Sequence, residues 1–325
     1  MRRLAAIATV LALTACGEDN EGPAAPAGEG FPVTIQHKFG TTEIESEPQR
    51  VVTVGYTEQD MVLALGVKPV GTREFLGGYD FRGRPWAQGA SEPPSVGGEQ
   101  INFERVAAQR PDLIIGVNSG MKKADYDKLS QIAPTVAQSD EFIDFGVPWQ
   151  EQTLIIGRAL GREAEARKLV DEVEAQFAKA RQEHPQFADA SLVMAYGTRG
   201  DFGAHSSGDY RLSFFEDLGF ESPPRIDELA GDGFFVDFDE EHFRLMDQDV
   251  VVMFGKRADV TADPVFKRLD AVAEERVIYV DLEDQFAGAL GFSSPLSLPY
   301  LLEEAVPQLA AAVDGDPKTT APEPE

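Results

Sequence analysis

The chain has 325 residues, of which 56 are acidic and 29 are basic, and its formal net charge at pH 7 is −27. This charge excludes nucleic-acid binding, which needs a basic face, and a protein body lying flat on anionic lipid. Cys16 is the only cysteine in the chain, so no intramolecular disulfide can form.

The first 15 residues have the pattern of a secretory signal peptide. Two arginines follow Met1, residues 4–13 are apolar, and small residues precede Cys16. The apolar run is shorter than the 20 or so residues that span a membrane. Residues 13–16 (LTAC) resemble the lipobox of bacterial lipoproteins, which implies cleavage before Cys16 and lipidation of its thiol. A signal peptide with an incidental cysteine is the alternative.

Two segments have no bulky apolar side chains and therefore cannot build a core. Residues 16–30 are rich in Gly, Pro, Ala and acidic residues, which predicts a lipidated flexible tether. Residues 314–325 have a similar composition and predict a disordered tail.

Between these segments, short β-branched runs alternate with helical patterns. The first half (31–147) predicts strands at 51–54, 68–72, 112–117 and 134–137, and helices at 58–65, 102–109 and 123–132. The second half (186–313) predicts strands at 191–196, 249–254 and 276–281, and helices at 208–218, 240–246, 263–274 and 296–312. Continuous apolar strands separated by helices favour parallel sheets covered on both faces. We therefore expect two α/β lobes, each with a parallel-rich sheet flanked by helices.

The segment that joins the halves, 148–185, has no strand pattern. Pro148 is placed to begin a helix, and Gly161 interrupts it. From 162 to 184, apolar residues recur at helical spacing until Pro185. At 1.5 Å per residue this helix would be about 35 Å long. Such a helix would join the lobes rigidly.

The two halves contain a matching pattern. Asn102 and Asp239 each begin a predicted helix, and Glu104 and Glu241 each follow two positions later. Each glutamate lies eight residues before the aspartate that opens the next strand. A glutamate in the first helical turn is also favoured by the helix dipole alone. The repetition of this pattern in both halves favours a functional interpretation instead, in which each lobe presents one exposed carboxylate.

Four stretches together resemble the substrate-binding lipoproteins of ABC importers for ferric siderophores, haem and cobalamin. They are VVTVGYTEQDMVLALGVKPVGT, NFERVAAQRPDLII, WQEQTLIIGRALGREAEARKLVDEV and FSSPLSLPYLLEEAVPQL. The resemblance covers about residues 31–313 and implies two lobes bridged by one long helix, with a ligand cleft between the lobes. It also implies that Glu104 and Glu241 form salt bridges with arginines of a permease, and Glu240 is an alternative to Glu241.

The resemblance implies a monomeric receptor on the extracytoplasmic face of the cell membrane, held there by its acyl anchor. Its expected ligand is a ferric siderophore, which it would deliver to an ABC permease. Haem or cobalamin is the alternative cargo. An extracytoplasmic hydrolase and a surface sensor are alternatives from other classes.

Ligand contacts in open α/β sheets come from loops beyond the C-terminal ends of strands. Aromatic side chains offer apolar area to a bulky organic ligand, and arginines can bind the oxygens of a ferric chelate. Each candidate could instead serve the core or pair with a surface acid. This rule selects Tyr56, Arg73, Trp86, Tyr196, Arg199, Phe254 and Phe286; Asn118 also follows a predicted strand.

Neither catalysis nor a resident metal or other cofactor is expected. Of the four histidines, only His205 lies in a predicted cleft loop, where it could contact haem iron together with Tyr210. Bare-metal cages need several histidine or carboxylate ligands. The sequence has no GxSxG, HExxH, P-loop or GxGxxG motif. A hydrolase would have to use His205 with Ser206 or Ser207 and a nearby aspartate.

Overall fold

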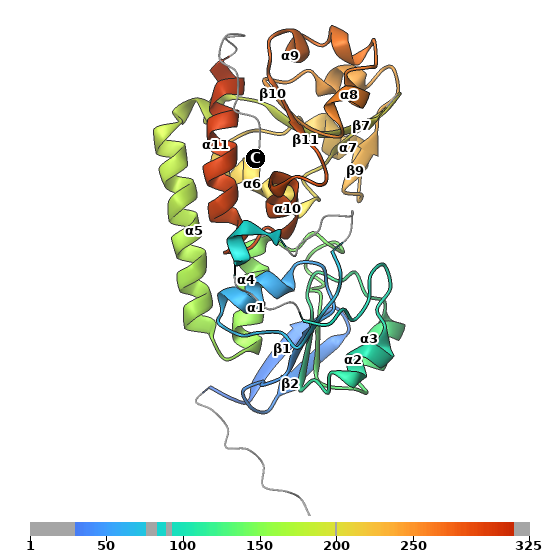
Figure 1. The fold of residues 1–325 in the computed structure, drawn as a ribbon, viewed down its shortest axis with the longest axis vertical. Coiled ribbons are helices and arrows are strands. Elements are labelled where there is room, and N and C mark those ends of the chain that lie inside the picture. The colour runs from blue at the N-terminus through green and yellow to red at the C-terminus, as the bar shows by residue number, and fades with distance from the viewer. Residues whose placement is uncertain (1–29, 76–82, 89–92, 199, 315–325) are drawn as a thin grey trace, which may run out of the picture.

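The computed structural model describes residues 30–75, 83–88, 93–198 and 200–314. Its two larger sheets lie in different halves of the long axis of the molecule, with a long helix running beside both (Figure 1). The larger sheets take their strands from residues 51–137 and 192–280, respectively.

The sheet of the first half is parallel throughout. Its strands pair in the order β4 (Gly71–Thr72), β3 (Val51–Thr53), β5 (Leu113–Gly116) and β6 (Thr135–Ala137). The helices of this half are α1 (Glu58–Ala64), α2 (Phe103–Ala108) and α3 (Lys123–Leu129). A separate antiparallel hairpin, formed by β1 (Val33–His37) and β2 (Gly40–Ile44), precedes them and was not predicted from the sequence.

The sheet of the second half is mixed. Its strands pair in the order β11 (Val277–Val280), β10 (Val250–Phe254), β7 (Leu192–Thr198), β8 (Asp201–His205) and β9 (Phe235–Asp237). Strands β11, β10 and β7 pair in parallel, whereas β8 pairs antiparallel with both of its neighbours, β7 and β9. The α-helices are α6 (Ser213–Leu218), α7 (Pro224–Ala230), α8 (Arg257–Val260), α9 (Asp270–Ala273) and α10 (Gln285–Phe292).

Three helices link the halves. The chain passes through α4 (Trp149–Ala159) and then α5 (Glu163–Glu183), the long helix that the 3–4 spacing predicts. The last helix, α11 (Ser297–Asp314), packs beside α5 and also contacts the 3₁₀ turn η2 (Pro85–Ala87) of the first half (Figure 1). The C-terminal helix therefore connects the halves as well.

Alternate residues of the strands pack into different cores, which explains their continuous apolar sequences. In β3, Val51 belongs to a central cluster and Val52 to a cluster on the other face of the sheet. In β10, Val250 and Val251 divide in the same way. The central cluster contains side chains from both sheets and from α4, α5 and α11. The two halves thus share one hydrophobic core, which opposes large movements between them.

The structure corrects several predicted elements. The segment after residue 198 was predicted as a loop, but 201–205 form strand β8, in which Phe202 and Ala204 are buried and Gly200 (φ +87°) lies in the tight turn before it. The predicted helix at 240–246 is only the 3₁₀ turn η5 (Phe243–Met246). The predicted helices at 208–218 and 263–274 begin as the 3₁₀ turns η4 (Tyr210–Leu212) and η6 (Phe266–Arg268). The 3₁₀ turn η3 (Pro185–Asp189) follows α5.

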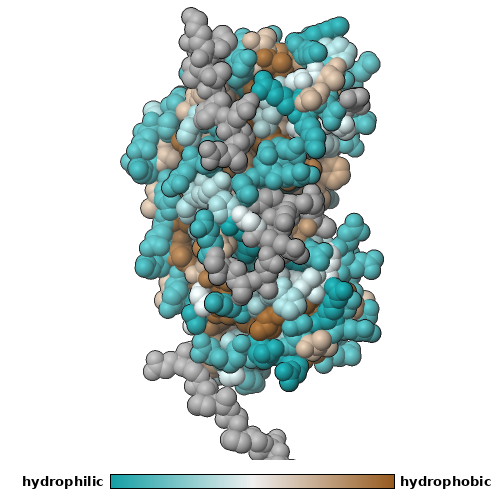
Figure 2. Space-filling model, viewed as in Figure 1, coloured by the Kyte–Doolittle hydropathy of each residue, from teal (hydrophilic) through white to brown (hydrophobic). Residues whose placement is uncertain are grey.

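The visible surface is mainly hydrophilic, and its apolar residues form small separate patches (Figure 2). Among the described helices, none combines the length and apolar character needed to cross a membrane. The predicted signal peptide, Cys16, most of the tether and nearly all of the tail lie outside the described residues.

Candidate functional site

A pocket of about 320 Å³ lies between the two halves. Its volume falls within the usual range for small-molecule sites. The first half contributes Tyr56, Phe75, Asn118 and Phe145, and the second contributes Asp209, Tyr210, Arg211, Phe234, Phe254, Leu282, Ala287 and Gly291. Six of these twelve residues are Phe or Tyr, so the wall is largely aromatic and apolar.

The pocket lies where the strand-end rule predicts it. Tyr56 follows β3, Asn118 follows β5, and Phe254 is the last residue of β10. Parallel strands bring their C-terminal ends to one edge of each sheet. The two edges face the same space, which is why residues distant in sequence meet there.

Arg73 anchors the floor on the side of the first half. Its guanidinium stacks over the ring of Tyr56, 4.0 Å from the centroid, and only 4% of the residue is exposed. Its Nε donates to the carbonyl of Gly98 at 2.7 Å, and Nη2 donates to that of Glu99 at 2.5 Å. Nη1 lies 3.3 Å from the carbonyl of Val54. Arg73 therefore holds Tyr56 in place through backbone contacts.

A buried carboxylate lies behind Asn118. Glu58 is fully buried, and its Oε1 accepts a hydrogen bond from the backbone N–H of Asn118 at 2.6 Å. Its Oε2 accepts one from the N–H of Thr57 at 3.2 Å. Burial raises the pKa of Glu58, and these hydrogen bonds oppose the rise. A Cβ on Gly55 would lie 2.0 Å from Glu58 Oε1, so a glycine is needed where the strand leaves the sheet.

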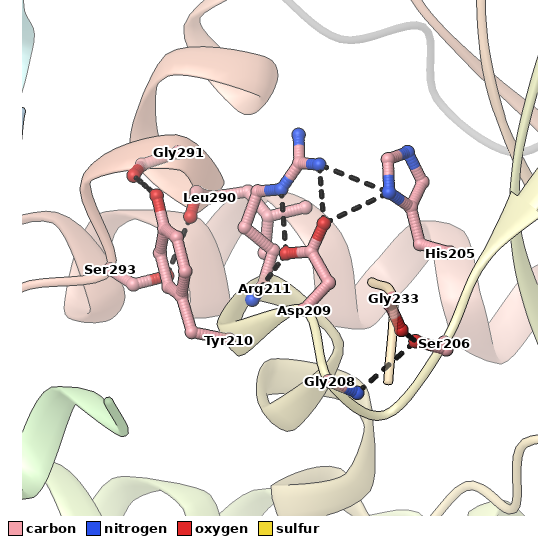
Figure 3. A network of polar contacts seen from close by, with 10 residues as sticks. All are labelled: His205, Ser206, Gly208, Asp209, Tyr210, Arg211, Gly233, Leu290, Gly291 and Ser293. Carbon is pink, nitrogen blue, oxygen red and sulfur yellow. Dashed lines mark hydrogen bonds and ion pairs between the residues drawn. The ribbon is translucent and has the colours of Figure 1, made fainter. Parts of the chain in front are cut away.

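On the side of the second half, Asp209 and Arg211 form a bidentate ion pair (Figure 3). Arg211 Nε lies 2.9 Å from Oδ1, and Nη2 lies 2.6 Å from Oδ2. His205 Nδ1 contacts the same Oδ2 at 2.9 Å. Burial alone would raise the pKa of Asp209, but the Arg211 guanidinium outweighs it and holds this pKa well below its usual range. The aspartate is therefore ionised across the physiological pH range.

Tyr210 joins this turn to helix α10. Its hydroxyl donates to the carbonyl of Gly291, and Ser293 Oγ donates to that of Leu290 nearby (Figure 3). Burial raises the pKa of Tyr210 above its ordinary value. A hydroxyl used in this way is poorly placed to ligate haem iron, as the haem alternative would require.

The structure divides the residues selected from the sequence. Tyr56, Asn118 and Phe254 line the pocket, whereas Arg73 lies directly beneath Tyr56. Arg199 lies outside the described residues. The other three, Trp86, Tyr196 and Phe286, do not line the pocket. Trp86 donates a hydrogen bond to Asp60 and packs on Tyr300, and the hydroxyl of Tyr196 donates to Asp237 at 2.7 Å. Phe286 is only 1% exposed and lies within the core.

Arg211 and Asp209 are the main polar residues that sequence reasoning missed. The strand-end rule holds for parallel strands, whereas these residues follow the antiparallel strand β8. An aspartate two positions before an arginine also carries no distinctive signal. The Gly-rich segment preceding them was the only available indication of an unusual turn.

The two expected docking glutamates are both exposed. Asn102 Oδ1 accepts from the N–H of Arg105 at 3.0 Å, so it caps α2 as predicted. Asp239 Oδ1 accepts from the N–H of His242, also three residues further on, at 2.9 Å and caps a turn in the same manner. The local resemblance between the halves therefore extends to the capping hydrogen bonds, although only the first cap begins an α-helix.

The side chains considered for hydrolysis make other contacts. Ser206 Oγ donates to the carbonyl of Gly233 at 2.9 Å, and Ser207 Oγ donates to Asp227 at the same distance. Neither hydroxyl is directed to His205 by a hydrogen bond in the described structure. Within the described residues, no group of three or more His, Cys, Asp or Glu side chains could hold a metal ion.

Two α/β halves, a long connecting helix and an aromatic pocket between the halves define a two-lobed ligand-binding protein. The chain belongs to the periplasmic binding protein family, whose model matches residues 51–283. This family comprises substrate-binding proteins, and the chain is one of these and not an enzyme.

Named relatives agree with this assignment. YhfQ of Bacillus subtilis, whose name describes an ABC transporter substrate-binding lipoprotein, is 28% identical over 77% of this chain and 81% of its own. A periplasmic solute binding protein of Mycobacterium smegmatis is 33% identical, covers 88% of this chain and 100% of its own, and has a TM-score of 0.76. PiaA of Streptococcus pneumoniae, solved in complex with ferrichrome, is 26% identical over 87% of this chain and 99% of its own, with a TM-score of 0.76.

Proposed function

We propose that this protein captures a ferric siderophore and delivers it to the permease of an ABC importer. The observation that carries the proposal is the aromatic pocket between the lobes, into which one guanidinium is held by an aspartate. Aromatic walls suit the organic frame of a chelate, and a guanidinium suits its iron-binding oxygens. PiaA, which is similar throughout its length, was crystallised with such a ligand.

The protein would be held at the membrane by lipid on Cys16. The name of YhfQ, a lipoprotein, supports this part of the proposal. Residues 16–30 would act as a tether between the acyl chains and the lobes, on the extracytoplasmic face of the cell membrane. The acidic body would be repelled by anionic lipid while the acyl chains hold it close.

Delivery would use the two exposed glutamates, Glu104 and Glu241, one from each half. Both carboxylates are exposed beside a capped turn, so arginines of a permease could reach them. The protein would act as a monomer, and the siderophore would be cargo and not a resident cofactor.

The test is a fluorescence titration of the mature protein with ferric hydroxamate, catecholate and carboxylate chelates, and with haem and cobalamin. Trp86 packs on Tyr300 of α11, and Trp149 Nε1 donates to Asp217 of α6. Trp149 belongs to the central hydrophobic cluster shared by the two halves, and Trp86 packs against it. A bound ferric chelate absorbs light and should quench their emission. Saturable quenching by a ferric chelate is expected. Quenching by haem or cobalamin alone would contradict the siderophore assignment.

A pocket variant links the signal to this site. Phe254→Leu keeps an apolar side chain but removes an aromatic wall, so it should weaken the chelate by about tenfold. Phe243→Leu, at a partly buried ring that packs on Phe202 away from the pocket, is the matched control. Equal effects of both variants would place the ligand elsewhere.

A further inference from the structure

The described lining of the pocket is electrically balanced. Among the twelve residues that line it, Arg211 is the only basic residue and Asp209 is the only acidic one. Both are ionised, since Arg211 retains its proton and each stabilises the charged form of the other. The aromatic wall therefore presents a dipole and no net charge.

The geometry of the pair fixes this balance. Two guanidinium nitrogens of Arg211 are directed to the two oxygens of Asp209, and the N–H of Arg211 also donates to Oδ1 at 3.0 Å. Asp209 is only 5% exposed and His205 closes its remaining side. Figure 3 shows Nη1 of Arg211 pointing away from both partners, and no hydrogen bond from it is found within the described chain. One edge of the guanidinium thus stays available beside Phe254, whose ring centroid is 5.8 Å away.

Two nearby cations, Arg73 and Lys256, are already engaged with other groups of the chain. Arg73 is 4% exposed and its donors are directed to backbone carbonyls. Lys256, which follows β10, lies 3.9 Å from a carboxylate oxygen of Asp281. A ligand with several negative charges would therefore lose its hydration in an apolar pocket without matching cations, which is costly.

We propose that Asp209 sets the charge selectivity of the pocket, so that it accepts electrically neutral ferric complexes of the tris-hydroxamate kind and rejects polyanionic ones. This inference rests on the proposed function and specifies its ligand class. Three hydroxamates neutralise the charge of ferric iron, whereas three catecholates leave the complex strongly negative. A neutral complex needs only the hydrogen bonds of Arg211 Nη1 and aromatic contact.

The experiment compares ferrichrome, a neutral tris-hydroxamate complex, with ferric enterobactin, a tris-catecholate trianion, by fluorescence titration of the mature protein. The wild type should bind ferrichrome about a hundredfold more tightly, because desolvating an unmatched charge outweighs a single guanidinium contact. Tighter binding of the catecholate would overturn the charge proposal and leave the proposed function standing. Binding of neither complex, nor of any other ferric chelate, would overturn both.

Variants test the role of Asp209 itself. Asp209→Asn leaves the Arg211 charge uncompensated and should reduce the preference for ferrichrome by about tenfold, because a nearby unit charge acts strongly in a desolvated site. Asp237→Asn changes the net charge equally but lies outside the lining, so it is the control. Equal effects of the two variants would overturn the proposal.

A second pair of variants covers the case in which Asp209→Asn does not fold. Arg211→Gln removes the only guanidinium of the described lining and should increase discrimination against the trianion. The double variant Asp209→Asn/Arg211→Gln restores neutrality and should recover the preference for the uncharged complex. If the ratio of the affinities for the two complexes were the same in wild type and in these variants, the proposal would be overturned.

Discussion

Trp86 Nε1 donates a 2.6 Å hydrogen bond to Oδ2 of Asp60, a fully buried carboxylate of helix α1. Arg84 Nη2 contacts the other oxygen at 2.9 Å. The indole also packs against Tyr300 of α11, with 5.4 Å between ring centroids. Asp60 therefore fastens the turn η2 between the first half and the C-terminal helix, which explains why Trp86 is not part of the pocket lining.

This carboxylate should make stability depend on pH. Burial raises the pKa of Asp60 from 3.8 to about 6, although Arg84 and Trp86 oppose the rise. The folded protein therefore binds this proton more tightly than the unfolded chain does, and the unfolding free energy should increase as the pH falls through 6 toward 4. Between pH 7 and pH 5 the Asp60 contribution should be about 1 kcal/mol.

Asp60→Asn should remove this contribution, since the amide does not ionise. Urea unfolding of both proteins at several pH values would measure it as a change in the difference between their unfolding free energies. Asp171→Asn, at an exposed position of α5, controls for the change in net charge. A difference between wild type and Asp60→Asn that did not vary between pH 5 and pH 7 would contradict the prediction.

A close contact behind the pocket gives a second prediction. Gly120 has φ +58°, and a Cβ there would lie 2.3 Å from the ring of Phe145, which lines the pocket. Gly120→Ala should therefore displace this ring and weaken chelate binding, besides losing about 1–2 kcal/mol from backbone strain. Fluorescence titration and urea unfolding would measure the two effects.

Gly231, whose ψ is −120°, offers a control for the change in chelate affinity. It has the same φ of +58°, but a Cβ there would meet nothing within 4 Å. Gly231→Ala should lose stability through its own backbone conformation but retain chelate affinity. If the two alanine variants had equal affinity, the Phe145 ring would not depend on Gly120 in the way proposed.

The framework of this fold could be predicted from the sequence because both faces of its central strands are buried. The apolar run at 249–254 is visible without any knowledge of its neighbours, and the 3–4 spacing of α5 is equally local. Strand β8 was missed because glycine at 203 interrupts its pattern. That glycine is needed, since a Cβ there would lie 2.2 Å from the hydroxyl of Tyr196.

The site was only partly predictable, for a related reason. Tyr56 and Phe254 could be selected because they end or follow parallel strands. Phe286 met a similar criterion but belongs to a helix face directed into the core. Arg211 meets Asp209 because the chain turns at this point, between β8 and η4. The conformation of that turn depends on the residues packed around it, which the local sequence does not reveal.

Arg73 gives a third prediction, which separates support from ligand contact. Arg73→Lys keeps the charge but loses the planar stack on Tyr56 and several hydrogen bonds to carbonyls, so the unfolding free energy should fall by about 2 kcal/mol. Arg167→Lys, at an exposed position of α5, should change it little. Unchanged stability together with lost chelate affinity would show instead that Arg73 binds the ligand directly.

The fourth prediction concerns delivery to the permease. The double variant Glu104→Ala/Glu241→Ala should bind the ferric chelate normally, because both side chains are exposed and outside the pocket lining. Uptake of the iron-labelled chelate by cells should nevertheless fall by about tenfold or more, since two docking charges are lost. Glu104→Ala/Glu240→Ala distinguishes the neighbouring glutamates and should lose less uptake if Glu241 is the docking residue. Normal uptake by the first double variant would show that the permease recognises another surface.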